Sequence, residues 1–256
     1  MAEFDRQTLN ARAGSAAAID EGLRSYMLRV YNYMGIGLVV TGLVAYFANA
    51  AALTTNADNA VGQLANGQLV TQFGALIYGS PLQWVVMLAP LAFVMVLSFG
   101  INKMSVGTAQ LVFWAFAAVM GLSLSSIFLV YTGASIAKVF FITAATFGAM
   151  SLYGYTTKRD LTSIGNFLIM GLIGLIIASV VNIFLQSGMM DFIISAVGVL
   201  IFVGLTAYDT QKIKESYNEA HGMDVMAKNA IMGALSLYLD FINLFMMLLR
   251  LFGNRN

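Results

Sequence analysis

The sequence contains no cysteine, one histidine and few charged residues, and each scarcity excludes a class of function. Without cysteine the chain forms no disulfide, holds no iron–sulfur centre and offers no thiol nucleophile. The lone histidine, His221, excludes most zinc sites and leaves histidine-based catalysis without a basis. The 13 basic residues nearly balance the 12 acidic ones, so there is no positive excess of the kind that binds nucleic acid.

Hydrophobic residues are abundant instead. They make up 59 % of the chain, charged residues make up 10 %, and the mean hydropathy is +0.81. Soluble domains are about 45–50 % apolar and about 25 % charged. A water-soluble globule of 256 residues would have too little interior for so much apolar surface. The composition therefore predicts that lipid is the solvent for most of the chain.

Seven apolar runs have the length, about 20 residues, that an α-helix needs to cross a bilayer. Most are apolar around the whole helix, as expected when lipid or other helices cover every face. A transmembrane β-barrel would show short alternating segments instead. The sequence thus predicts an all-α integral membrane protein with seven transmembrane helices. The predicted spans are Val30–Ala52, Leu82–Ile101, Ala109–Tyr131, Ile136–Tyr155, Ile164–Leu185, Phe192–Tyr208 with a continuation past Gln211, and Ala230–Phe252.

Basic residues predict the orientation. Ten of the 13 fall on one side of the seven predicted spans, in the N-terminal tail and in the second, fourth and sixth loops. Lys138, Arg250 and Arg255 fall on the other side. The positive-inside rule then places the N-terminus in the cytoplasm and the C-terminus outside. We expect a cytoplasmic tail over residues 1–25 and a seven-helix transmembrane domain over residues 26–256.

Two carboxylates, Asp209 and Asp240, fall within or at the end of the apolar runs. Ionisable groups cost a few kcal/mol or more in hydrocarbon, so they face the protein interior and usually mark a function. Asp240 follows Lys228 by 12 residues, roughly 18 Å of helical rise, which is about the middle of the membrane. Asp191, by contrast, begins the sixth predicted helix, where an acid suits the positive end of the helix dipole; we interpret it as structural.

The sixth and seventh predicted helices form an antiparallel hairpin centred near Gly222, which brings Asp209 and Asp240 to similar depths. Two carboxylates close together in a medium of low dielectric constant cannot both ionise cheaply, so they would share one proton. Loss of that proton would create repulsion that either separates the helices or recruits a cation. Oxygen ligands suit a hard ion such as Ca²⁺. Alternatively, each aspartate is a structural residue that bonds Tyr, Ser or Asn on a neighbouring helix.

Three segments resemble the Bax inhibitor-1 family, whose bacterial branch is YccA-like. They are Gly121–Tyr131, Ala207–Ile213 with its Ala-Tyr-Asp-Thr-Gln-Lys-Ile motif, and Leu237–Phe245 with Leu248–Gly253 behind it. The resemblance implies seven helices with the last one central, a pH-sensitive Ca²⁺ leak, and a place in the bacterial inner membrane. It also implies that Asp209 and Asp240 form a proton-sensing pair, which could hold calcium, and that Arg250 is a secondary gate or an anchor. Family members often carry a charged residue in the second helix, but Leu82–Ile101 has none.

Three other functions stay open at this point. A non-conducting regulator would bind a membrane protease or another membrane protein through the loops. An intramembrane enzyme is disfavoured, because no hydrolase or cofactor motif and no glycine-flanked catalytic aspartate is present, so we expect no enzymatic activity and no cofactor besides the calcium ion. A secondary transporter would show an inverted repeat or paired broken helices, and neither can be read from the sequence.

Overall fold

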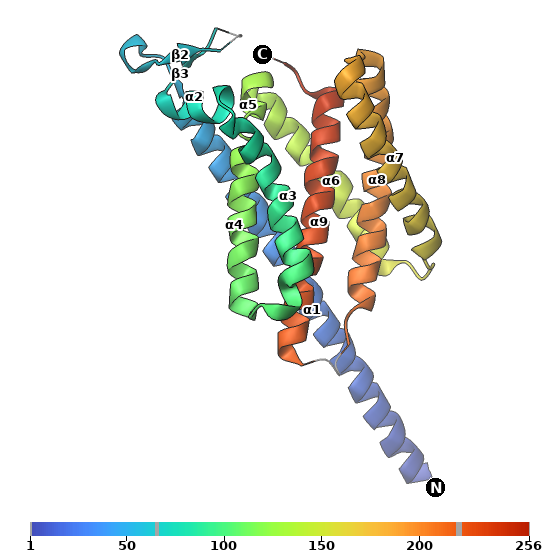
Figure 1. Ribbon diagram of the computed structural model, residues 1–256. Coiled ribbons are helices and arrows are strands. Elements are labelled where there is room, and N and C mark those ends of the chain that lie inside the picture. Colours follow the sequence, from blue (N-terminus) through green and yellow to red (C-terminus); the bar gives the residue numbers. More distant parts are fainter. Residues whose placement is uncertain (1, 65–66, 219–221, 256) are drawn as a thin grey trace.

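The computed structural model describes the backbone of residues 2–64, 67–218 and 222–255, and their side chains from residue 21 onward. Among these residues seven helices are long and apolar enough to cross a membrane, which confirms the predicted fold class (Figure 1). His221 lies outside the described residues. The spanning helices are α1 (Ala2–Ala52), α3 (Leu82–Gly100), α4 (Val106–Leu124) continued by α5 (Ile127–Val130), α6 (Gly133–Thr156), α7 (Thr162–Leu185), α8 (Gly188–Glu215) and α9 (Met223–Phe252).

Several helices begin before the predicted apolar runs because polar residues cap them. The hydroxyl of Ser105 accepts a hydrogen bond from the backbone N–H three residues on, at 3.2 Å, and starts α4. Thr132 caps α6 in the same way and Ser187 caps α8. Such side chains satisfy N–H groups that have no partner within the helix. Hydropathy alone does not detect this polar first turn.

The third span differs from the prediction, which made Ala109–Tyr131 one continuous helix. α4 ends at Leu124 and the short helix α5 follows after Ser125 and Ser126. The Ser125 hydroxyl donates to the Leu122 carbonyl at 2.7 Å and the Ser126 hydroxyl donates to the Ser123 carbonyl at 3.3 Å. Serine hydroxyls that bond nearby backbone compete with the regular helical pattern. Two consecutive serines therefore interrupt the helix, while Val106–Val130 remains one candidate membrane span.

The connection between the first two spans is folded rather than extended. It contains β1 (Leu53–Thr54), η1 (Ala57–Asn59), β2 (Gly62–Gln63), β3 (Leu69–Val70) and α2 (Gln72–Gly79). β3 pairs antiparallel with both β1 and β2, giving the order β1-β3-β2. This small sheet lies at the same end of the bundle as the C-terminus (Figure 1). We call it the sheet end, and the opposite end, where α8 connects to α9, the hairpin end.

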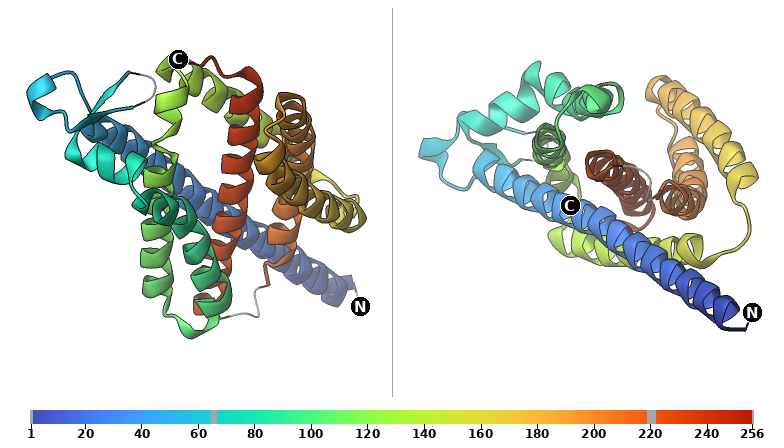
Figure 2. Two further views of the ribbon diagram at one scale, coloured as in Figure 1. Left: turned by 45° about the horizontal axis from the view of Figure 1, so that its top comes forward. Right: turned by 90° about the horizontal axis from the view of Figure 1, so that it is seen from below.

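α9 is the most buried of the spans. In the most apolar 18-residue stretch of α9, 67 % of the residues are buried, against 6–33 % in the other six spans. It packs against α1, α4, α6 and α8, which lie around it in the end-on view (Figure 2). Leu237, Tyr238, Leu244 and Leu249 have no exposed surface. The central part of α9 therefore has mostly other helices, not lipid, as its surroundings.

Two glycines let neighbouring helices approach α8 closely at Ala207 and Tyr208. A Cβ atom at Gly154 of α6 would overlap the carbonyl oxygen of Ala207, and one at Gly165 of α7 would overlap the ring of Tyr208. Small residues commonly permit such close packing between membrane helices. α8 is thereby held on two sides at the residues that immediately precede Asp209.

Candidate functional site

The two aspartates found in the apolar runs meet inside the bundle. Asp209 projects from α8 and Asp240 from α9, and their carboxyl groups lie within hydrogen-bonding reach of each other. Asp240 is 5 % exposed. Its Oδ2 atom has no hydrogen-bond partner among the described residues. The structure thus joins two like-charged groups in the interior, which requires a proton or a cation to offset their repulsion.

A hydrogen bond on the opposite face of α9 fixes the direction of Asp240. The hydroxyl of Tyr238 lies 2.6 Å from Oγ1 of Thr41 on α1, and that Oγ1 donates to the Ala117 carbonyl on α4 at 2.8 Å. The Tyr238 ring also packs edge-on against Phe116 of α4. Residues two apart on a helix point to nearly opposite faces. Anchoring Tyr238 on α1 and α4 therefore directs Asp240 toward α8.

A polar cleft reaches the pair from the hairpin end. It has a volume of about 330 Å³ and opens between α8 and α9. The residues that line it are Asp209, Lys212, Ile213, Ser216, Asn229, Met232, Gly233 and Ser236. Asp209 thus has access to this cleft, while Asp240 does not line it. Water and small ions can approach the pair from this side.

Toward the sheet end the surroundings of Asp240 become apolar and aromatic. Phe241 and Phe245, one residue and five residues further along α9, are both buried. Each packs edge-on against Phe140 of α6, with ring centroids 5.4 and 6.3 Å apart. A fissure of about 90 Å³ beside them is lined almost entirely by apolar atoms. The pair is therefore accessible from the hairpin end and sealed by rings toward the sheet end.

The pair alone offers few ligands for a resident metal ion. Among the described residues, no group of three or more His, Cys, Asp or Glu side chains could hold a metal. Ca²⁺ takes six to eight oxygen ligands. Two carboxylates supply at most four of these, so water or backbone oxygens would have to complete the shell. The two carboxylates alone therefore do not complete a Ca²⁺ coordination shell.

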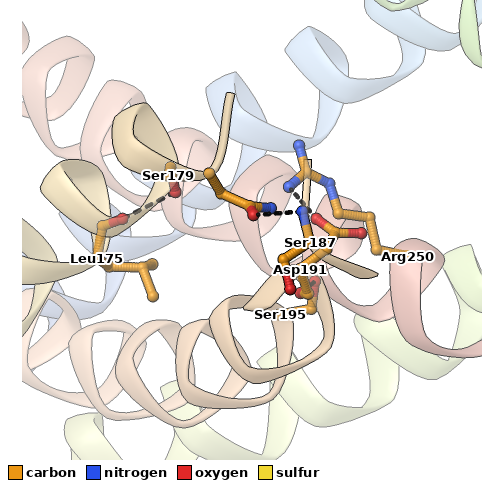
Figure 3. Close-up of polar contacts among 7 residues, drawn as sticks. Leu175, Ser179, Ser187, Asp191, Ser195 and Arg250 are labelled. Carbon is orange, nitrogen blue, oxygen red and sulfur yellow. Dashed lines mark hydrogen bonds and ion pairs between the residues drawn. The ribbon is translucent and has the colours of Figure 1, made fainter. Parts of the chain in front are cut away.

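Arg250 lies at the sheet end, where it forms an ion pair that the sequence reasoning missed. Its Nη1 atom is 3.5 Å from Oδ1 of Asp191 at the start of α8, and both side chains are 38 % exposed (Figure 3). The structural interpretation of Asp191 did not include this partner. The sequence did indicate this contact, because Asp191 is in the first turn of one helix and Arg250 is in the last turn of its antiparallel neighbour. In this structure Arg250 pairs with the sixth span, not with a charge on the second.

The residues after α9 fasten the same end of the bundle to α6. The Thr132 N–H donates to the Asn254 carbonyl at 3.1 Å, and the Asn254 N–H donates to the Ser135 hydroxyl at 2.8 Å. Tyr131 and Arg255 form an isolated antiparallel bridge. α9 is thus tied to α8 through Arg250 and to α6 through its C-terminal extension.

Comparison with known proteins identifies the family. The sequence model described as "Inhibitor of apoptosis-promoting Bax1" matches residues 23–256. The chain belongs to the Bax inhibitor-1 family. The match includes the first two spans and the long connection between them, which the three motifs did not cover. The resemblance stated from those motifs is confirmed.

Bacterial relatives of this Bax inhibitor-1 protein align over nearly their whole length. The inner membrane protein YbhL of Escherichia coli is 48 % identical over 246 residues, which cover 95 % of this chain and 97 % of YbhL. An uncharacterized protein of Rickettsia prowazekii is 50 % identical over 236 residues, 92 % of each chain. A protein of Caulobacter vibrioides is 46 % identical over 237 residues, covering 92 % of this chain and 91 % of the relative.

Proposed function

We propose that this protein is a proton-gated leak pathway for Ca²⁺ in the bacterial inner membrane, and that Asp209 and Asp240 form its gate. The observation that carries the proposal is the meeting of the two carboxyl groups inside the bundle, with one oxygen of Asp240 left without a partner. The seven apolar helices and the name of the relative YbhL support this location.

The proton acts as the latch in this account. While one proton is shared, the carboxyl groups hold α8 and α9 together through a hydrogen bond. When the proton leaves, two negative charges remain at short range in a medium of low dielectric constant, where their repulsion is strong. The helices relieve it by moving apart or by admitting a cation.

The cleft and the aromatic seal give the pathway a direction. Ions and protons enter the cleft beside Asp209 from the hairpin end, which the distribution of basic residues assigns to the cytoplasm. The rings of Phe140, Phe241 and Phe245 close the route toward the sheet end. We therefore interpret this arrangement as the closed state of the leak, in which conduction requires these rings to separate.

Calcium flux into liposomes tests the proposal. The purified protein is reconstituted with an internal calcium dye, and the flux is measured between about pH 6 and pH 8 for the wild type, Asp209→Asn and Asp240→Asn. Asp224→Asn is the matched control, because Asp224 is an exposed acid in the first turn of the same helix, α9. A single titrating proton changes an equilibrium at most about tenfold per pH unit.

We expect a pH-dependent flux in the wild type and in the Asp224→Asn control, and a flux that no longer varies with pH in the other two variants. Unchanged pH dependence in both gate variants would refute the gate. An absence of flux from folded wild type, together with a co-purifying membrane protease or other membrane protein, would favour the non-conducting regulator instead.

A further inference from the structure

We propose that the groove between α1 and α6 at the hairpin end is a binding site for an anionic phospholipid. The groove has a volume of about 610 Å³, within the range of small-molecule sites in proteins. Its lining residues come from α1 and α6 alone, and they are Arg24, Met27, Leu28, Tyr31, Met34, Gly35, Phe147, Gly148, Ser151, Leu152 and Tyr155.

Two glycines keep the inner part of the groove open. Gly35 lies on the α1 wall and Gly148 on the α6 wall. At both positions an added Cβ would meet no heavy atom within 4 Å, in contrast to Gly154 one and a half turns further along α6. The helices do not need these glycines in order to approach each other. The space that they leave is lined by side chains such as Met34 and Phe147, so hydrocarbon fits it.

The mouth of the groove lies at the membrane boundary and is positively charged. The Tyr26 hydroxyl is 3.1 Å from the hydroxyl of Ser216, which ends α8, so this turn of α1 is level with the hairpin end. Arg24 lies half a turn further out on α1 and is exposed. Lys214 of α8 donates to the Tyr155 carbonyl at 2.8 Å and lies over the Tyr155 ring. Two cations thus flank the mouth, where a phosphate group of the adjoining leaflet would lie.

Polarity along the groove follows the order of groups in a phospholipid. Arg24 is at the boundary, the bonded hydroxyls of Tyr31 and Ser151 come next at 2.7 Å from each other, and the glycine-lined apolar part is innermost. From Arg24 to Gly35 the helix rises through 11 residues, roughly 16 Å, which is about half the thickness of the hydrocarbon core. The groove therefore has the depth of one leaflet.

Native mass spectrometry of the full-length protein, released from micelles that contain defined lipids, tests this site. The probes are phosphatidylglycerol and phosphatidylethanolamine with the same acyl chains, and inorganic phosphate serves as the probe without chains. Arg24→Gln removes the charge at the mouth. Arg29→Gln is its control, since Arg29 lines a different surface hollow at the same end of α1. Gly148→Leu fills the groove, Gly35→Leu fills it from the other wall, and Gly174→Leu is the control at an equally open glycine on α7.

We expect the wild type to retain phosphatidylglycerol in preference to phosphatidylethanolamine and to retain no inorganic phosphate. Arg24→Gln should weaken phosphatidylglycerol retention about fivefold, as expected for one basic residue at a membrane surface, and Arg29→Gln should leave it unchanged. Gly148→Leu and Gly35→Leu should each reduce retention of both lipids, and Gly174→Leu should not.

Equal losses in Arg24→Gln and Arg29→Gln would show general attraction to the basic surface and would overturn the site. Retention that is unchanged by both leucines in the groove would also overturn it, as would phosphate binding without chains. Thermal unfolding of each variant in the same micelles shows whether it is folded, and if one leucine variant fails to fold, the variant on the opposite wall decides the outcome.

Discussion

Two pairs of charged side chains connect α8 to α9, and they differ in sign, burial and surroundings. At the sheet end Asp191 and Arg250 carry opposite charges and are each 38 % exposed. Inside the bundle Asp209 and Asp240 are two acids, and Asp240 is 5 % exposed. The outer pair is attractive because its charges are opposite, but the surrounding water weakens the attraction. The inner pair is attractive only while a proton is present.

The backbone around the two pairs differs in the same way. α8 is gripped by glycine contacts from α6 and α7 immediately before Asp209, and α9 is anchored through Tyr238 two residues before Asp240. Asp191, by contrast, lies in the first turn of α8, which the side chain of Ser187 caps. The backbone segments that carry the inner pair are therefore held by their neighbours on both helices. In the proposed gate, a change in the charge of this pair is relieved by helix movement or by a cation.

Of the substitutions that distinguish the two pairs, Asp240→Asn should have the largest effect, and it should act on the pH dependence of folding stability. In the proposed gate, the folded wild type holds a proton between the carboxyl groups that the unfolded chain releases, so its stability should fall as pH rises. The expected fall is at most about 1.4 kcal/mol per pH unit for one proton. Asp240→Asn should flatten this dependence at pH values above the unfolded-state carboxyl pKa of about 4, whereas Asp224→Asn should leave it intact. Equilibrium unfolding in mixed micelles measures both, and parallel curves for wild type and Asp240→Asn would contradict the shared proton.

Gly154→Ala tests whether the inner segment of α8 is rigidly held. The new methyl group would overlap the Ala207 carbonyl, and overpacking of this kind costs typically about 1–3 kcal/mol. Gly148 lies six residues before Gly154 on the same helix, and a Cβ atom there meets open space. Gly148→Ala should therefore be neutral or slightly stabilising. Thermal unfolding of the two variants compares them directly. Equal stability would mean that α6 does not hold α8 at this point.

Tyr238→Phe tests the anchor that directs Asp240 toward α8. The change removes the hydroxyl that lies 2.6 Å from Thr41 Oγ1 and should cost about 1 kcal/mol. Thr41 keeps its bond to the Ala117 carbonyl, so its hydroxyl retains a partner. Leu237→Ile, a volume-conserving change at the neighbouring buried position, controls for disturbance of the core. An unfolding free energy for Tyr238→Phe equal to that of the wild type would show that the bond does not stabilise the fold.

Alanine substitutions at Asp191 and Arg250 should have the smallest effect on folding stability. Exposed ion pairs typically contribute about 0.2–1 kcal/mol, and salt screens them. A double-mutant cycle of Asp191→Ala and Arg250→Ala should therefore give a coupling energy in this range that declines at high ionic strength. A coupling of several kcal/mol would show that the outer pair is a main fastening between α8 and α9, and the contrast drawn between the two pairs would be lost.

Hydropathy predicted the spans because the lipid-facing and buried residues of each helix are apolar alike. It also drew attention to Asp209 and Asp240, since a carboxylate is conspicuous in an apolar run. The same pattern could not reveal the break at Ser125 and Ser126, where two small hydroxyls change the backbone without changing the hydropathy. It also gave no sign of the sheet formed by β1–β3, whose strands are only two residues long.

The ion pair between Asp191 and Arg250 was missed for a different reason. The residues are 59 apart in sequence, and each had a sufficient local explanation as a helix-end charge. The antiparallel arrangement that brought Asp209 and Asp240 to one depth also brings these two ends together. Consideration of the charges at both ends of the hairpin, not only inside it, would have predicted the contact.

Infrared spectroscopy of the carboxyl groups tests the central claim most directly. A protonated carboxylic acid has a carbonyl stretch that is separate from the bands of an ionised carboxylate. At neutral pH the wild-type protein in lipid should show the band of one protonated acid, and the double variant Asp209→Asn with Asp240→Asn should lack it, while Asp224→Asn should retain it. A wild-type spectrum at neutral pH without that band would show that no proton is held between α8 and α9, and it would contradict the account.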